Sequence, residues 1–215
     1  MLPRRLPARL AAIFALGLLA IPSSAEPSHH AVHAHAPDPD SGDEWLGQPA
    51  PAWAFDRWVR GGPKSLDRLR GRVVLVRWWN EDCHFCEETL PALERLRHEY
   101  PDLVVVAAFH PKPVRGVSNR HVLDVAAELG YGGPIAFDGH WRTLDRYWLD
   151  GHPERNWTSV SFLIGREGEI RWVHGGGEYH PSTDPRHARC DAKYHELEGA
   201  VRAALADSTA SPPKL

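Results

Sequence analysis

Two cysteines separated by two residues, Cys83 and Cys86, are the residues whose types and spacing most directly indicate chemistry. They follow an apolar, β-branched run at residues 73–76 and precede leucines at helical spacing, so they should lie where a buried strand ends and a helix begins. The first turn of a helix has unpaired N–H groups and a partial positive charge, both of which stabilise a thiolate. Cysteines at this spacing can also form a disulfide. We therefore expect Cys83 to be the exposed nucleophile and Cys86 to resolve a mixed disulfide.

The residues around this pair act on its charge in opposite directions. A protonated His84, between the two cysteines, would favour the Cys83 thiolate, whereas Asp82, directly before it, would oppose the thiolate. A stable reduced form makes an oxidant and a less stable one makes a reductant, so the sequence leaves the redox direction open. The alternative is a disulfide that only caps the helix and takes no part in exchange.

The beginning of the chain has the pattern of an export signal. Residues 1–25 combine three arginines with an apolar run at residues 10–21, which is short for a membrane span, and end in small residues. We expect a cleaved signal peptide and a periplasmic or otherwise secreted protein, with an uncleaved anchor as the alternative. Removing three arginines from a chain of net charge −3 leaves a charge of about −6, which argues against a nucleic-acid partner.

The remaining 190 or so residues predict one folded domain between two flexible segments. Residues 26–44 are rich in Pro, Asp and His and nearly free of large apolar side chains, so they predict a flexible leader. Residues 45–207 form the domain, and residues 208–215 a tail. The chain has only three cysteines, whereas a disulfide-stapled secreted scaffold would use more.

Hydrophobic periodicity predicts an α/β domain. Strands at residues 73–78 and 103–109 flank a helix at residues 83–100, which contains Pro91, and this order implies parallel pairing. The other expected elements are a hairpin within residues 45–60, a helical turn at 65–69, a helix from Ser118 or Asn119, a short edge strand at 135–137, a short helix at 141–148, a hairpin of strands 160–164 and 170–174, and a helix at 191–206. Together they predict one mixed central sheet with helices on both faces and the thiols at the carboxyl end of a central strand.

This pattern resembles the thioredoxin superfamily, in particular the exported TlpA-like and ResA-like thiol-disulfide oxidoreductases, or redoxins. The residues that carry the resemblance are 73–79, 83–86, 90–93 and 157–164. It implies a thioredoxin-like fold, a protein-disulfide oxidoreductase that uses the redox-active Cys83 and Cys86, and no required cofactor. It also implies that the partners are protein thiols and disulfides, with a membrane thiol relay as the electron donor.

Three departures from the family pattern mark residues that could modulate the pair. Asp82 stands where the family usually has tryptophan, and Glu88 precedes the position at which ResA-like proteins carry a glutamate. Ser159 falls near the usual cis-proline, and since a cis peptide without proline costs about 3 kcal/mol, we expect a trans bond there. In the adjoining strand, Trp78 and Trp79 must face opposite sides of the sheet, so one should be core and the other could wall the site.

Two other chemistries remain open. The absent cis-proline favours metal binding, and soft thiolates with an imidazole suit copper(I); the candidate ligands are Cys83, Cys86 and His174, with His180 as a further imidazole. This arrangement partly resembles Sco-type copper metallochaperones. A peroxiredoxin-type peroxidase is less favoured, because that chemistry wants threonine or serine three residues before the reactive cysteine, and this chain has Asn80.

The third cysteine, Cys190, has two interpretations. It is either a small packed residue just before the last helix or a third redox or metal partner near the other thiols.

Overall fold

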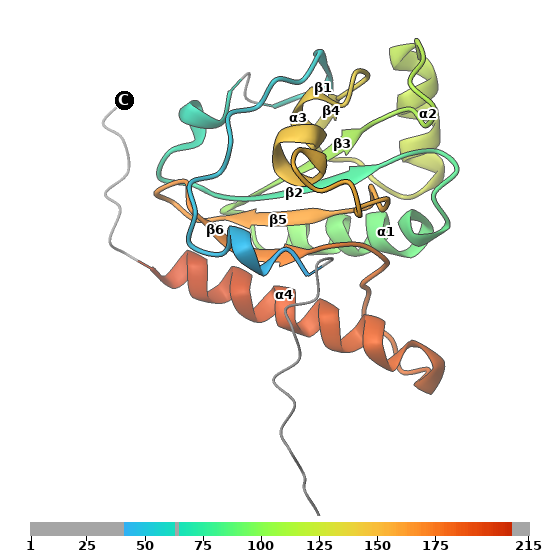
Figure 1. Cartoon of the computed structure of the whole chain (residues 1–215). Helices are drawn as coiled ribbons and strands as arrows, with labels where there is room; N and C mark the ends of the chain where they lie inside the picture. The colour runs from blue at the N-terminus through green and yellow to red at the C-terminus, as the bar shows by residue number, and fades with distance from the viewer. Residues whose placement is uncertain (1–40, 63–64, 208–215) are drawn as a thin grey trace, which may run out of the picture. The chain divides into compact units, whose positions relative to one another are not determined.

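A six-stranded sheet forms the centre of the computed structural model, which describes residues 41–62 and 65–207. The expected signal peptide, residues 26–40 of the leader, and the tail lie outside these residues. The strands are ordered β1-β4-β3-β2-β5-β6 (Figure 1). Their bounds are β1 Arg57–Arg60, β2 Val73–Trp79, β3 Leu103–Phe109, β4 Ile135–Phe137, β5 Ser161–Ile164 and β6 Ile170–His174.

Both parallel and antiparallel pairs occur in this sheet, so the predicted mixed sheet is confirmed. β2 pairs in parallel with β3, and β3 with β4, while β5 runs antiparallel to both β2 and β6. The expected edge position of residues 135–137 is wrong, because β1 pairs antiparallel with β4 on its outer side.

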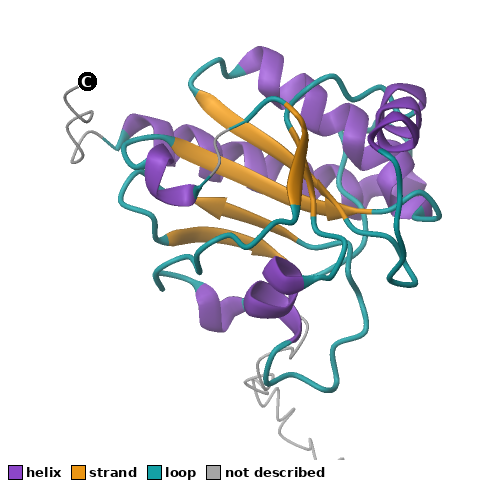
Figure 2. Ribbon diagram, turned by 90° about the horizontal axis from the view of Figure 1, so that it is seen from above, coloured by secondary structure: helices purple, strands orange, loops and turns teal. Residues whose placement is uncertain are grey.

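Helices of very different lengths cover the sheet in the described part of the chain (Figure 2). The helices are α1 His84–Glu99, α2 Asn119–Glu128 and α4 Ala188–Ala206, with α3 Arg142–Leu144 continuing into a π-helical turn, η3 Asp145–Leu149. The 3₁₀ turns are η1 Asp43–Trp45, η2 Leu66–Leu69 and η4 Pro185–His187. Ser118 caps α2 by accepting a hydrogen bond from the His121 backbone N–H. Among the described residues, no helix is both long and apolar enough to cross a membrane.

Strand β2 is buried on both faces, and its alternating side chains enter two separate cores. Trp79 joins the core beneath α1, α2 and α4, whereas Trp78 joins the core beneath η2 and η3. The prediction that the two tryptophans face opposite sides is thus confirmed. Both are fully buried, however, so Trp79 lies below the cysteine pair, in the same core cluster as Cys86, and does not wall a groove.

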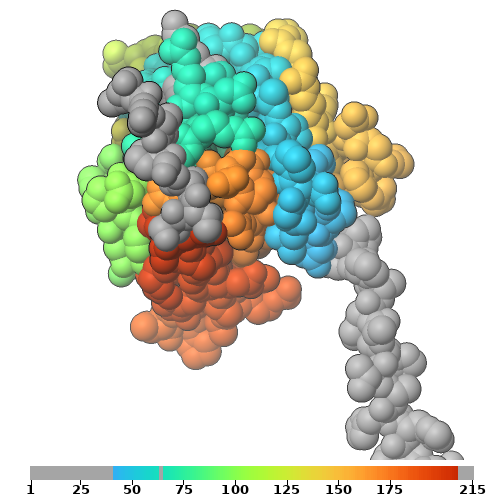
Figure 3. All heavy atoms as spheres, turned by 90° about the vertical axis from the view of Figure 1, so that its left-hand side faces the viewer, coloured from blue at the N-terminus to red at the C-terminus, as the bar shows by residue number. Residues whose placement is uncertain are grey.

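Residues 45–56 do not form the expected hairpin. They cross the face of the sheet that carries Trp78. Pro49 makes an isolated antiparallel bridge with Glu169, at the start of β6, so the segment runs beside the β5–β6 hairpin (Figure 3). Trp53 and Phe55 then pack on the second core before the chain reaches β1 at the opposite edge. Ordered structure also begins earlier than the predicted leader boundary, since η1 includes Asp43 and Glu44.

Candidate active site

The cysteine pair lies at the junction of strand β2 and helix α1, as predicted. Cys83 is the N-cap residue of α1 and Cys86 lies in its first turn, where the Cys86 N–H donates to the Cys83 carbonyl at 2.8 Å. The two residues form a disulfide with their Cα atoms 5.3 Å apart. The pair therefore sits on the electropositive end of a helix, where a thiolate would be stabilised once the disulfide is reduced.

The two sulfurs differ in how far they are exposed. Cys83 is half-buried at the surface, whereas Cys86 has no exposed area and belongs to the core cluster beneath α1. A thiol of another protein can therefore approach Cys83 but not Cys86, and this asymmetry matches the expected division between a nucleophile and a resolving cysteine.

Ser159 faces the accessible sulfur. Its Oγ lies 3.2 Å from Cys83 Sγ, and the residue itself is buried. A hydroxyl at this distance can donate a hydrogen bond to a thiolate on Cys83. Within the described residues the cis peptide bond is Lys112–Pro113, so the bond before Ser159 is trans, as expected.

A fully buried arginine holds the Ser159 segment in place. Arg77, in the middle of β2, donates from Nη1 to the Ser159 carbonyl at 2.6 Å and from Nη2 to the Gly177 carbonyl at 2.7 Å. Burial lowers the pKa of Arg77 to about 10, and the neighbouring Tyr179 and Glu178 oppose this shift, so the side chain stays a cation at neutral pH. The sequence interpretation missed Arg77, although a charge inside an apolar strand was the signal that could have found it.

A second set of hydrogen bonds joins α1 to the loop after β6. Thr89 Oγ1 donates to the Phe85 carbonyl at 2.7 Å and accepts from the Tyr179 N–H at 3.3 Å. The Tyr179 hydroxyl lies 2.9 Å from Ser161 Oγ, which also accepts from Arg77. Burial raises the pKa of Tyr179, so its hydroxyl remains protonated. Thr89, which stands where ResA-like proteins carry a glutamate, is thus buried and links α1 to the loop after β6 through hydrogen bonds.

The three charged residues proposed as modulators lie at the surface. Asp82, His84 and Glu88 are all exposed. His84 Nδ1 is 3.6 Å from Glu87 Oε2, and the Asp82 N–H donates to Asn80 Oδ1 at 3.1 Å, which shapes the turn before the pair. Asp82 and His84 line the same depression as Cys83, so the opposed electrostatic roles predicted for them stay predictions with a suitable position.

Cys83 lines one surface depression, and a second depression shares Phe85 and Trp157 with it. The smaller, of about 300 Å³, contains Cys83, Lys112 and Ser159, and the larger, of about 470 Å³, contains Phe85 and His174. The side chain of Trp157 is 46% exposed, and its ring lies 5.8 Å from the Phe85 ring. Exposed aromatic surface beside a reactive group is typical of a docking surface for another molecule.

Two imidazoles lie near this region: His174 is half-buried and His110 is fully buried. His174, a predicted copper ligand, lines the larger depression and stacks on Trp172 at 5.8 Å, while Cys83 lines the smaller one. Burial, with a contribution from Arg77, lowers the pKa of His174 to about 3. His110 follows β3, is fully buried against Trp141, and has its pKa lowered to about 3 by burial; the sequence interpretation took it only as a strand end. Copper binding by the cysteine pair and His174 stays a prediction.

Comparisons with known proteins agree with this geometry. The model of the AhpC/TSA family matches residues 46–173. Thiol-disulfide oxidoreductase YkuV of Bacillus subtilis is 24% identical over 134 residues, which cover 61% of this chain and 86% of YkuV. Thiol-disulfide oxidoreductase ResA of Halalkalibacterium halodurans is 28% identical over 123 residues, or 55% of this chain and 62% of ResA.

Solved structures share the fold. The crystal structure of a Chlorobium tepidum protein assigned as the thiol:disulfide interchange protein DsbE superposes with a TM-score of 0.57. The match has 23% sequence identity and covers 74% of this chain and 97% of that one. The predicted thioredoxin-like fold is thereby confirmed.

Proposed function

Since this chain belongs to the AhpC/TSA family, within the thioredoxin superfamily, and is a thiol-disulfide oxidoreductase, we propose that it exchanges disulfides with exported proteins through Cys83 and Cys86. One observation carries the proposal: a disulfide at the start of a helix has one sulfur at the surface and the other in the core. This asymmetry directs a substrate to Cys83 and keeps Cys86 for the second step.

The exchange moves two electrons in two displacements. To oxidise a substrate, a substrate thiolate attacks Cys83 Sγ, the bond to Cys86 breaks, and Cys86 leaves as a thiolate. A second substrate thiolate then attacks the substrate sulfur of the mixed disulfide, releasing the substrate disulfide and leaving Cys83 as a thiolate. The reducing direction reverses these steps, so that Cys86 attacks Cys83 Sγ and releases the reduced substrate.

The chain's own residues assist at the accessible sulfur. The Ser159 hydroxyl and the first turn of α1 stabilise negative charge on Cys83 whenever Cys83 attacks or leaves. Arg77 holds the Ser159 carbonyl, so the hydroxyl stays in position through the cycle. The exposed Trp157 supplies an apolar contact for an unfolded segment of the substrate.

The setting that we propose is the periplasm or another exported compartment, with a membrane thiol relay as electron partner. Support comes from the signal-like pattern of residues 1–25 in the sequence. Oxidising compartments are also where disulfides of substrate proteins form and persist, so an oxidoreductase of this type has its substrates there.

Substitution of the two cysteines tests the proposal. Cys83→Ser should abolish insulin reduction and the isomerisation of a scrambled protein, because it removes the accessible sulfur. Cys86→Ser should instead trap a mixed disulfide, visible as an added mass that dithiothreitol removes. A suitable control is His195→Ala, an exposed residue of α4 that should keep full activity. Wild-type rates in Cys83→Ser would overturn the proposal.

Copper chemistry is a second candidate at the same cysteines. The expectation is that the reduced pair binds copper(I) with His174 as third ligand, as in a Sco-type metallochaperone. Calorimetric titration of copper(I) into reduced protein checks this, and a His174→Ala variant with unchanged affinity would remove His174 from the ligand set. Hydrogen peroxide consumption is expected to be slow, because Asn80 occupies the position at which a peroxiredoxin-type peroxidase carries threonine or serine.

A further inference from the structure

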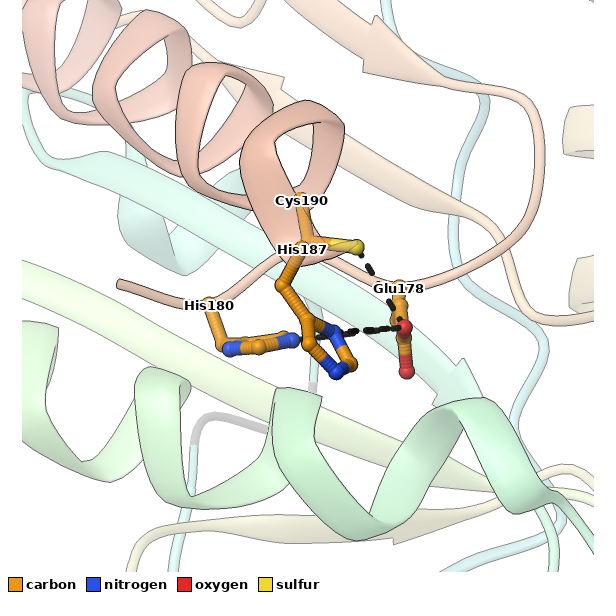
Figure 4. Close-up of side chains that lie close together, drawn as sticks. All are labelled: Glu178, His180, His187 and Cys190. Carbon is orange, nitrogen blue, oxygen red and sulfur yellow. Dashed lines mark hydrogen bonds and ion pairs between the residues drawn. The ribbon is translucent and has the colours of Figure 1, made fainter. Parts of the chain in front are cut away.

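A second cluster of reactive side chains lies between the loop after β6 and the start of α4. It consists of Glu178, His180, His187 and Cys190, whose ligand-type atoms all lie within 4.8 Å of one another (Figure 4). None of these residues lines the two depressions beside Trp157. The cluster is thus distinct in its residues from the Cys83–Cys86 pair.

The four side chains converge on one carboxylate oxygen. Glu178 Oε1 lies 3.3 Å from Cys190 Sγ, 3.6 Å from His187 Nδ1 and 4.0 Å from His180 Nε2. In a tetrahedral zinc site with bonds of about 2.0–2.3 Å, the ligand atoms are separated from one another by about 3.3–3.8 Å. The three separations from Glu178 are close to that range and all the others are within 4.8 Å, so side-chain movements of about an ångström would bring the four atoms around one ion.

His180 gives the strongest indication that this cluster binds a metal ion. The residue is 7% exposed, and its Nε2 is buried without a hydrogen-bond partner in the described part of the chain. An unpaired polar atom in such a place costs free energy unless something binds it. Its other ring nitrogen, Nδ1, lies 3.4 Å from the Pro181 carbonyl; in the tautomer that donates this hydrogen bond, Nε2 carries the lone pair that a metal ion needs.

The backbone around the cluster is held by its own hydrogen bonds. Asp184 caps η4 by accepting from the Arg186 N–H at 2.9 Å, and the Ser182 N–H donates to Asp191 Oδ1 at 2.9 Å. The His180 N–H also reaches the Cys190 carbonyl at 3.4 Å. These hydrogen bonds fold the loop back on the start of α4 and hold the four side chains close together.

We propose that Glu178, His180, His187 and Cys190 bind one zinc ion. One thiolate, two imidazoles and one carboxylate form a four-ligand set of the kind that zinc takes, whereas calcium and magnesium prefer oxygen ligands. Tyr179, which lies between two of the ligands in the sequence, contacts Thr89 of α1 and Ser161 of β5, so the ion would hold the loop after β6 against these two elements. It would also hold the third thiol as a ligand and away from disulfide exchange. In this proposal Cys190 is a metal partner, one of the two roles expected for it, and His180 serves this site and not the cysteine pair.

Cobalt(II) titration of the oxidised chain tests the proposal. In that form Cys83 and Cys86 are joined, so Cys190 is the one thiol able to give a thiolate-to-cobalt charge-transfer band. We expect this band to saturate at one equivalent, with the visible absorption of tetrahedral cobalt, and zinc to bleach it. The histidines at residues 29–35 can bind cobalt without producing such a band.

Variants separate the site from chance binding. Cys190→Ser should lose the charge-transfer band, and His180→Ala or His187→Ala should weaken cobalt binding at least tenfold. His98→Ala, which removes an exposed histidine of α1 outside the cluster, should bind like wild type. Zinc should also raise the melting temperature of wild type but not of Cys190→Ser, and should slow alkylation of Cys190 at least tenfold in wild type.

Several results would overturn the zinc site. They are no band in oxidised wild type, a band that survives in Cys190→Ser, unchanged affinity in both histidine variants, or binding of copper alone. Because Cys190→Ser replaces one atom, its melting temperature without metal should match wild type; if it does not, Glu178→Gln, which keeps the side chain's shape, serves as the variant. All these readouts are independent of oxidoreductase activity, so their failure leaves the proposed function standing.

Discussion

At the scale of single residues, the buried positive charge of Arg77 is the feature that we expect to influence the reactivity of Cys83 most. Its guanidinium reaches the Ser159 and Gly177 carbonyls, and Ser159 in turn faces Cys83 Sγ. A fixed cation in a low-dielectric setting favours a nearby anion much more than a surface charge does. The exposed Asp82 and His84 are screened by water and should matter less to the thiolate.

Replacing Arg77 tests this role. In Arg77→Met, the reduced Cys83 should react with iodoacetamide at pH 6 about threefold to tenfold more slowly, because less of it is thiolate. Arg77→Lys keeps the charge and should retain most of the reactivity, although one carbonyl loses its donor. A wild-type alkylation rate in Arg77→Met would contradict the role. Both variants should be less stable, since an unpaired buried carbonyl costs about 1–3 kcal/mol.

The cysteine pair and the neighbouring Ser159 were predicted from the sequence, whereas Arg77, which holds the Ser159 segment, was not. Spacing and the flanking apolar run are local signals, so the sequence was enough to place Cys83 and Cys86 at a strand–helix junction. Arg77 looks like a solvent-facing residue until the pairing of β2 on both sides is known. The cluster around His180 depends on how one loop folds back on α4, which no local pattern specifies.

At the scale of elements, hydrogen bonds of Thr89 connect helix α1 to the loop after β6. The Thr89 hydroxyl donates to the Phe85 carbonyl within the helix and accepts from the Tyr179 N–H of the loop. Neither Thr89 nor Tyr179 lines the depression around Cys83, so loosening this contact should lower the stability of the fold more than the activity.

Thr89→Val should therefore lower the free energy of unfolding by about 1–3 kcal/mol, because the buried Tyr179 N–H loses its acceptor while the side-chain volume is kept. Urea denaturation measures the change. A matched control is Thr183→Val at an exposed position, which should change stability by less than about 0.5 kcal/mol. Equal free energies of unfolding for the two variants would show that the hydrogen bond between Thr89 and Tyr179 does not stabilise the fold.

The long elements were predictable and the edge of the sheet was not. β2, α1 and β3 follow from apolar runs and helical spacing, and their observed bounds differ from the prediction by one residue or less at each end. β1 has no alternating pattern, since its four residues are all half-buried, so nothing in the sequence indicated that it would pair outside β4. For the same reason residues 45–60 were wrongly predicted to form a hairpin.

At the scale of the whole molecule, two neutral imidazoles make stability depend on pH. The pKa values of His110 and His174 are lowered by burial from 6.5 to about 3, so the folded chain does not bind these two protons at mildly acidic pH, while the unfolded chain does. The stability that comes from keeping these two histidines neutral is therefore fully present above pH 6.5, and it is lost as the pH falls toward 3. Burial raises the pKa of Asp138, which acts in the opposite direction.

The histidine contribution should appear as a steep loss between about pH 6 and pH 4.5. Two protons correspond to a fall in unfolding free energy of about 2.7 kcal/mol per pH unit at most, since each contributes about 1.4. Urea denaturation at several pH values measures the slope. His110→Gln should remove roughly half of it, whereas an equally steep slope in this variant would assign the loss to other groups.

The unequal burial of the two sulfurs also determines how the reduced enzyme withstands peroxide. An oxidant reaches Cys83 first and forms a sulfenic acid there, while Cys86, in the core and already close enough to bond, condenses with it and releases water. That reaction returns the pair to its disulfide before irreversible sulfinic acid can form. Cys190 has no partner cysteine left, so damage would accumulate at this thiol unless an ion ligates it.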